Sequence, residues 1–217
     1  MPRPDPLRRW CATSFVADWD ADSPRLRQNL IGVLRDARDR ALRREVPALE
    51  DVRRWHRDAM AGLAVPDARF LGRFRGELGL GSVRVWVGSQ EGVPPDEVAE
   101  ELRVFERSLQ RAVGGLDAHC APGEDVDVDG LAAVIDLCAW AHAEWVRIHP
   151  FANGNGRTAR VLANALLMRY GIPPVVRLRP RPNAGYGRAA EAAMRGDWRP
   201  TAAAFRRMLS RPFTSSV

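Results

Sequence analysis

The sequence predicts a mostly α-helical fold with a single β-hairpin. Apolar residues recur at helical spacing in most segments, and glycines or prolines separate these segments. The segment 131–148 is apolar on most of its sides, which predicts a central, buried helix. Only residues 70–88 carry a strong β-strand signal. Because 217 residues are enough for one sizeable domain, we expect a single domain over residues 1–217.

Residues 1–66 are expected to form an N-terminal helical part. The aromatic residues of segment 1–22 indicate that this segment packs on the core. Ser23 suits the N-cap and Pro24 the first position of a helix, whose apolar stripe continues to about residue 45. A second stripe predicts a helix over residues 48–63, which a proline after it ends.

Residues 70–88 are expected to form the hairpin. The run 70–76 is punctuated by glycine, and residues 83–87 alternate and are rich in β-branched and aromatic side chains. One interpretation is a minor structural ribbon on a helical domain. The other is an exposed edge strand that binds an extended peptide through its main chain.

Residues 94–210 are expected to form the helical core. Two prolines open its first helix and a pair of glycines ends it, and the apolar helix then follows an acidic loop. A glycine closes the helix after that one. The helices expected in this part cover residues 94–113, 131–148, 156–170, 183–195 and 200–209.

The most specific motif of the chain lies in one loop and the helix start that follows it. Gly154 and Gly156 let the backbone turn tightly and approach a ligand. A helix that begins there directs free N–H groups at the turn, and Arg157 and Arg160 share one face of it. His149 can act as a base near neutral pH. These residues predict a site for a di- or triphosphate with a histidine at its rim.

This stretch resembles the signature loop of the Fic family, whose pattern reads H-x-F-x-[D/E]-G-N-G-R-x-x-R. Every fixed position matches except one, where Asn153 replaces the acidic residue. The resemblance covers most of the chain and is strongest from the hairpin to about residue 198. It implies the Fic fold, a helical bundle with a central buried helix, an active-site loop and one β-hairpin flap.

The resemblance also implies an activity, the transfer of AMP from ATP to a Ser, Thr or Tyr hydroxyl of a target protein. In this activity Mg²⁺ neutralises the leaving pyrophosphate. His149 matches the base that deprotonates the hydroxyl, and Phe151 matches a structural anchor of the loop. The residues that match the phosphate-binding part are Asn153, Gly154, Asn155, Gly156, Arg157 and Arg160.

The resemblance further places target docking on the hairpin, because the family flap holds a target segment by main-chain pairing. The flap residues in this chain are Gly72, Arg73, Phe74, Val83 and Val85. Tyr186 lies where the family often contacts the nucleoside, and two roles stay open for it. It can stack on a base, or it can be a core tyrosine.

Asn153 leaves the chemistry open. Mg²⁺ prefers anionic oxygen, so an amide at position 153 is a weak ligand and the ATP phosphates would hold most of the metal. The alternatives to adenylyl transfer are a Doc-like phosphotransferase, a transferase of another nucleotide, and a degenerate nucleotide-binding module without catalysis. The run Asn155-Gly156-Arg157 resembles Fic rather than Doc.

Two alternatives stay open for how the activity is inhibited. Many Fic proteins carry an inhibitory helix of the form [S/T]-x-x-x-E-[G/N], and the sequence has no clean match to it. Asp18 is a degenerate candidate for the acidic position. The other alternative is a separate small inhibitory protein, as in a bacterial toxin–antitoxin pair.

Composition narrows the partners and the location. The formal net charge is +6, and all 33 basic residues are arginine, interleaved with 27 acidic residues. This pattern indicates codon bias in a GC-rich genome and solvated helix faces, so nucleic acid is not an expected partner. Without a membrane-spanning run or a secretory signal, we expect a cytoplasmic protein. The three cysteines are scattered along the sequence, which is typical of reduced thiols. The pair Cys138 and His142 is more typical of a protein core than of a metal site.

Overall fold

The computed structural model describes residue 19 and residues 23–121, 125–182 and 185–210. The expected packing of segment 1–22 and the candidate Asp18 therefore lie outside the described residues, with the exception of Trp19. The Trp19 ring stacks on Phe70 with ring centroids 5.6 Å apart. The last expected helix is described up to residue 210, and Cys11 is not described.

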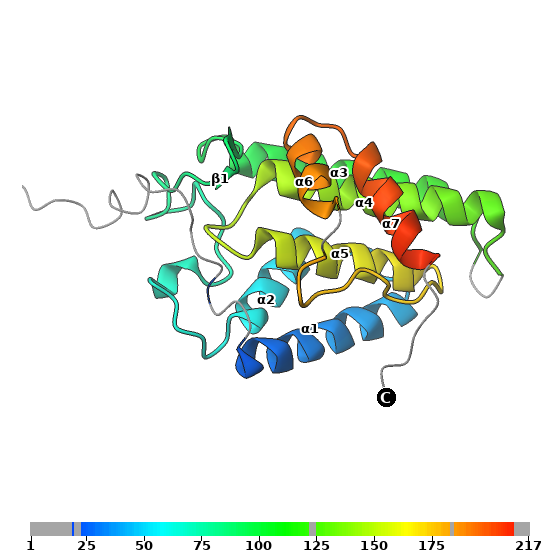
Figure 1. Ribbon diagram of the computed structural model, residues 1–217, viewed down its shortest axis with the longest axis horizontal. Coiled ribbons are helices and arrows are strands. Elements are labelled where there is room, and N and C mark those ends of the chain that lie inside the picture. The colour runs from blue at the N-terminus through cyan, green and yellow to red at the C-terminus, as the bar shows by residue number, and fades with distance from the viewer. Residues whose placement is uncertain (1–18, 20–22, 122–124, 183–184, 211–217) are drawn as a thin grey trace, which may run out of the picture.

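Seven α-helices and one two-stranded sheet make up the described part of the chain, which confirms the mostly helical fold. The elements are α1 (Pro24–Leu42), α2 (Leu49–Ala59), the short 3₁₀ helix η2 (Ala68–Phe70), β1 (Trp86–Val87), β2 (Gln90–Glu91), α3 (Val98–Asp117), α4 (Val128–Ile148), α5 (Asn155–Arg169), α6 (Tyr186–Met194) and α7 (Arg199–Leu209). Helix α5 contacts α1 and α2 on one side and α4 on the other, as Figure 1 shows.

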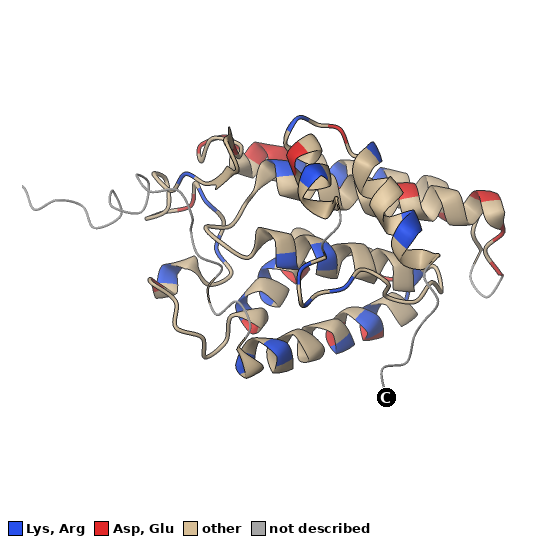
Figure 2. Cartoon of the chain, in the orientation of Figure 1, with Lys and Arg blue, Asp and Glu red and all other residues tan. Residues whose placement is uncertain are grey.

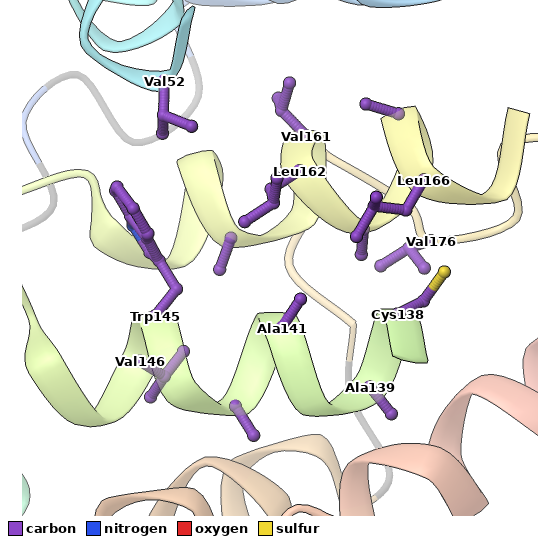
Figure 3. Close-up of a cluster of buried hydrophobic side chains, with 14 of the residues drawn as sticks. Val52, Cys138, Ala139, Ala141, Trp145, Val146, Val161, Leu162, Leu166 and Val176 are labelled. Atoms are coloured by element: carbon purple, nitrogen blue, oxygen red, sulfur yellow. The ribbon is translucent and has the colours of Figure 1, made fainter. Parts of the chain in front are cut away.

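Helix α4 is the central, buried helix that the sequence predicts. It contacts α3, α5, α6 and α7, so apolar side chains are buried around most of its circumference. Figure 3 shows Trp145 and Ala141 of α4 directed toward Leu162 of α5. The helix begins at Val128, before the expected residue 131, because the Asp127 carboxylate accepts a hydrogen bond from the Gly130 N–H and caps its first turn.

The hairpin exists, but its predicted span of 70–88 is wrong. Its strands are two residues each and lie later, with Trp86 opposite Glu91 and Val87 opposite Gln90. Residues 71–85 form turns and irregular backbone instead. At Gly76 the backbone has φ 87°, and a Cβ would lie 2.0 Å from the Pro95 carbonyl oxygen, so this run is folded back against the chain.

Other predicted boundaries were wrong by a few residues. Helix α3 begins at Val98 instead of 94, and it continues through Gly114 and Gly115 to Asp117. The two glycines do not end the helix because the Asp117 carboxylate, one turn further on, binds Arg169 at the end of α5. This tertiary contact outweighs the low helix propensity of glycine.

Charged residues are distributed over all the helices. Figure 2 shows arginines and acidic residues interleaved on most helix surfaces, as the sequence pattern indicates. Within the described ranges, no helix is long and apolar enough to cross a lipid bilayer.

Candidate active site

The loop between α4 and α5 carries the motif, and both of its ends have left-handed backbone. His149 is the C-cap of α4 with φ 54° and ψ 56°, and its N–H donates to the Trp145 carbonyl. Gly154 is the N-cap of α5 with φ 79°. A Cβ at Gly154 would lie 2.6 Å from the Met60 Cε atom and would displace that flexible side chain, so the left-handed conformation is the main reason for glycine there.

The imidazole of His149 has a defined tautomer. Its Nδ1 lies 2.9 Å from the Val146 carbonyl oxygen, which can only accept, so Nδ1 carries the hydrogen and Nε2 keeps its lone pair. Burial lowers the pKa of His149 to about 4, the Val146 hydrogen bond opposes this, and the Arg75 charge adds to it. His149 is therefore a neutral imidazole near pH 7 that can accept a proton at Nε2.

Arg75 fixes the backbone at His149, and the sequence pattern did not single it out. Its side chain is 1% exposed and donates to the carbonyls of His149 (2.7 Å) and Ile148 (3.0 Å). It also donates to Val83 (3.2 Å) and Val93 (2.8 Å) on the hairpin side. A guanidinium at the C-terminus of α4 suits the helix dipole, and burial lowers the pKa of Arg75 to about 10.

The hairpin approaches His149 at a glycine. The Gly92 N–H donates to the Val85 carbonyl at 3.0 Å, which extends the pairing of β1 and β2 by one step. A Cβ on Gly92 would lie 2.8 Å from the His149 Cβ. The hairpin is therefore in contact with the candidate base, and only a residue without a side chain fits at that point.

Phe151 and His56 hold the middle of the loop. The Phe151 ring is fully buried, and the His56 ring stacks on it with centroids 3.9 Å apart. His56 accepts from the Gly72 N–H at Nδ1 (3.0 Å), so its Nε2 donates to the Asn153 carbonyl (3.0 Å). Burial lowers the pKa of His56 to about 4, which keeps this bridging tautomer neutral. His56 is a second residue that sequence reasoning missed.

The side chains of the two loop asparagines, Asn153 and Asn155, make different hydrogen bonds. The Asn155 side chain is 1% exposed and makes two 2.8 Å hydrogen bonds to the backbone of Phe151, one as donor and one as acceptor. Its side chain therefore shapes the loop, and only its backbone is available to a ligand. The side-chain amide oxygen of Asn153, Oδ1, accepts from the Gly154 N–H at 2.5 Å.

Two buried guanidinium groups lie at the start of α5. Arg157 is 2% exposed and donates to the Trp19 carbonyl at 3.3 Å. Arg160 is 3% exposed and donates to the Leu178 carbonyl at 3.2 Å, while its Nε has no hydrogen-bond partner among the described residues. A Cβ on Gly156 would lie 3.3 Å from the Arg160 Nη1. The two charges and the helix N-terminus together favour an anion.

Tyr186 lies in the core. Its ring is 3% exposed, and its hydroxyl is 2.5 Å from the His142 Nε2. The Arg160 guanidinium is 6.0 Å from the centre of the ring. These contacts favour the core tyrosine over base stacking. His142 is bonded to Tyr186, and no group of three or more His, Cys, Asp or Glu side chains in the described segments could hold a metal ion.

The expected flap residues mostly make contacts within the protein. They stabilise the hairpin region and leave little of their own surface exposed for docking. The Gly72 N–H binds His56, Phe74 is 4% exposed with its ring 5.0 Å from Phe151, and Val85 is 5% exposed. Val83 binds Arg75 through its carbonyl, and Arg73 pairs with Glu77. The large apolar side chains exposed in this region are Leu78 and Trp86, neither of which is among the expected flap residues.

The comparisons with known proteins agree with the fold and with this loop. The family model for the Fic/DOC family matches residues 47–167. The protein adenylyltransferase Fic of Drosophila persimilis is 46% identical over 117 residues, which cover 54% of this chain and 20% of that protein. The protein adenylyltransferase fic-1 of Caenorhabditis elegans is 32% identical over 153 residues, which cover 70% of this chain and 25% of that protein.

Among solved structures, a Fic domain containing signaling protein from Bacteroides thetaiotaomicron matches with a TM-score of 0.59. It is 18% identical and covers 94% of this chain and 74% of that one, which shows a shared fold. The fold and the loop thus define a Fic-type protein, and the chain belongs to the Fic/DOC family. It spans only 13% to 25% of the length of the curated relatives it matches.

Proposed function

We propose that this protein is a protein adenylyltransferase, an enzyme that transfers AMP from ATP to a Ser, Thr or Tyr hydroxyl of a target protein. The observation that carries the proposal is a neutral imidazole, His149, beside an anion site built from Arg157, Arg160 and the N-terminus of α5. The names of the matching relatives support the same activity.

In the proposed reaction the target hydroxyl oxygen attacks the α-phosphorus of ATP. The bond from that phosphorus to the oxygen bridging it to the β-phosphate breaks, and pyrophosphate leaves. His149 takes the hydroxyl proton at Nε2, since its Nδ1 hydrogen is bonded to Val146. Arg157 and Arg160 hold the phosphate chain and stabilise the charge that moves onto pyrophosphate.

The protein residues do not by themselves form a magnesium site at the loop. Residues 149–160 include no carboxylate, and the Asn153 amide oxygen is occupied by the Gly154 N–H. An amide is a weak ligand for Mg²⁺ compared with a carboxylate. We therefore propose that any Mg²⁺ arrives on the ATP phosphates, with Asn153 as a minor ligand, and we assign it no separate step.

Transfer of label from ATP tests the function. The protein is incubated with cell extract and either α-labelled or γ-labelled ATP, and we expect protein-bound label from the α-phosphate alone. His149→Ala should lose about 10²–10⁴-fold in rate with ATP affinity unchanged within a few-fold, because His149 serves the hydroxyl. His119→Ala is the matched control, since His119 is exposed at the far end of α3.

Two results would contradict the proposal. Label from the γ-phosphate alone would assign a Doc-like phosphotransferase, and ATP binding without label would assign a nucleotide-binding module. Mass spectrometry of the labelled proteins identifies the target. An inhibitory antitoxin protein and a cytoplasmic location stay predictions from the sequence.

A further inference from the structure

A cavity in the described part of the chain lies far from the motif loop. It has a volume of about 830 Å³ and lies between the last turns of α3, the first turns of α4 and Trp198, which precedes α7. Asp129 on its rim is separated from His149 by twenty residues, almost the whole of α4, which corresponds to about 30 Å along the helix axis. The cavity is therefore separate from the candidate active site.

The walls of this cavity are apolar and fixed. Leu116, Leu137, Trp140 and Trp198 line it, together with small residues that leave room. The Trp140 ring stacks on Phe105 with centroids 5.6 Å apart, so its position is set by the core. The volume is in the range of about 300–1,000 Å³ that small-molecule sites occupy.

The rim of the cavity is acidic on a chain that is basic overall. Asp127, Asp129 and Asp136 line it together with His119. None of the chain's 33 arginines is among the described lining residues, although Arg206 pairs with Asp136 from outside the cavity. Figure 2 shows acidic residues, without basic ones, at the end of α4 that adjoins the α3–α4 connection. An acidic rim on an apolar cavity complements a cation attached to an apolar body.

The three carboxylates differ in their present contacts. Asp127 caps α4, and Asp136 binds the Arg206 guanidinium at 2.5 Å, which shows that a guanidinium fits at this rim. Asp129 is exposed and has no hydrogen-bond or ion-pair partner among the described residues. A bound cation would therefore meet Asp129 first, with its apolar body against Trp140 and Trp198.

We propose that this cavity binds an organic cation, an ammonium or guanidinium group on an alkyl or aryl body. Such a cation can come from a free amine or from an arginine or lysine side chain of a partner protein. Aromatic walls and a carboxylate at the rim are the groups that recognise it. The site does not depend on adenylyl transfer, because its test measures binding alone.

The test uses three probes with the same apolar body and different charge: 4-phenylbutylamine, 4-phenylbutanol and 4-phenylbutyrate. Calorimetric titration of the full chain should show the amine binding about ten-fold more tightly than the alcohol, and the acid most weakly. Asp129→Asn should remove most of the preference for the amine and leave alcohol binding unchanged. Asp39→Asn, an exposed aspartate on α1, is the control and should behave as wild type.

A second variant and a fourth probe complete the design. Trp198→Leu should weaken binding of the amine and the alcohol alike, and if it fails to fold, Asp129→Asn still decides the outcome. A capped Arg-Phe dipeptide that binds more tightly than the amine would assign the cation to a partner protein, and the reverse would assign it to a free amine. Equal binding of the three probes, or no binding, would overturn the proposal.

Discussion

Three histidines, the buried His56 and His142 and the partly buried His149, have lowered pKa values, and this has a consequence for stability. Burial is the largest cause in each case, and it lowers their pKa values from 6.5 to about 4, 3 and 4. In the unfolded chain they would titrate near 6.5. Between these values the unfolded chain binds more protons than the folded one, so low pH favours unfolding.

We expect the free energy of unfolding to fall as the pH is lowered from about 6.5 to about 4. Each of the three histidines should contribute about 1.4 kcal/mol per pH unit in this window. Urea denaturation at a series of pH values measures the slope. His142→Gln should make the slope shallower, and the exposed His119→Gln should leave it unchanged. An unaltered slope in His142→Gln would show that His142 is not buried in its neutral form.

A second prediction at the residue scale concerns position 153. Asn153→Asp should lower the Mg²⁺ concentration needed for half-maximal transfer and raise the rate, because a carboxylate is a stronger ligand than an amide. Stability should not suffer, since a negative charge next to the N-terminus of α5 is favourable by about 0.3–1 kcal/mol. A titration of transfer rate against Mg²⁺ measures the change.

Two other outcomes at position 153 have distinct meanings. An unchanged Mg²⁺ requirement and rate would show that residue 153 does not contact the metal. A loss of activity would show that the loop is adapted to the amide, whose oxygen now accepts from the Gly154 N–H. That result would favour a chemistry other than adenylyl transfer.

At the scale of elements, Arg75 joins three parts of the site. Its four side-chain hydrogen bonds connect the end of α4 to the run before β1 and to the residue after Gly92. The backbone of His149 is thus held by the hairpin region. We infer that Arg75 positions the base without touching substrate.

Arg75→Lys tests this role. A lysine keeps the charge but cannot reach four carbonyls, so we expect a loss of about 1.5–3 kcal/mol in the free energy of unfolding. Transfer should slow with ATP affinity unchanged within a few-fold, and the NMR signals of the His149 ring should shift. Arg73→Lys is the control for stability and for the His149 signals, because Arg73 is only partly buried and pairs with Glu77. Unmoved His149 signals would make Arg75 purely structural.

The elements show where sequence reasoning succeeds and where it ends. The helices follow from local signals, such as the Ser23 cap, whose hydroxyl accepts from the Leu26 N–H. The hairpin boundary was wrong because the fold of residues 71–85 depends on Arg75 and on close approach at Gly76, which no local pattern reveals. The motif loop could be found from its own residues. His56, Arg75 and Gly92 could not, because they reach it from far away in the sequence.

At the scale of the molecule, one carboxylate connects three helices at the end of α5 remote from the motif loop. Asp117 of α3 binds Arg169 of α5 at 2.5 and 2.7 Å and Arg44, just after α1, at 2.8 Å. The Tyr170 hydroxyl donates to it at 3.0 Å. Its hydrogen bond to Arg169 is the largest cause that holds the pKa of Asp117 below its ordinary value.

Asp117→Asn should lower the free energy of unfolding by about 1.5–3 kcal/mol at pH 7, since it removes the charge that pairs with a buried arginine. Chemical denaturation measures this loss. Asp136→Asn is the control, because its pair with Arg206 is more exposed and should be worth less than about 1 kcal/mol. Equal losses in the two variants would argue against a connecting role for Asp117.

The left-handed backbone at His149 has a meaning for how this sequence evolves. A residue with a side chain pays about 1–2 kcal/mol for that conformation, and glycine would adopt it freely. Selection for fold stability alone would therefore favour glycine at position 149, at the end of α4. We infer that the histidine is kept at this helix terminus for its imidazole. If the proposed function is correct, a lineage that lost the reaction should lose this residue early.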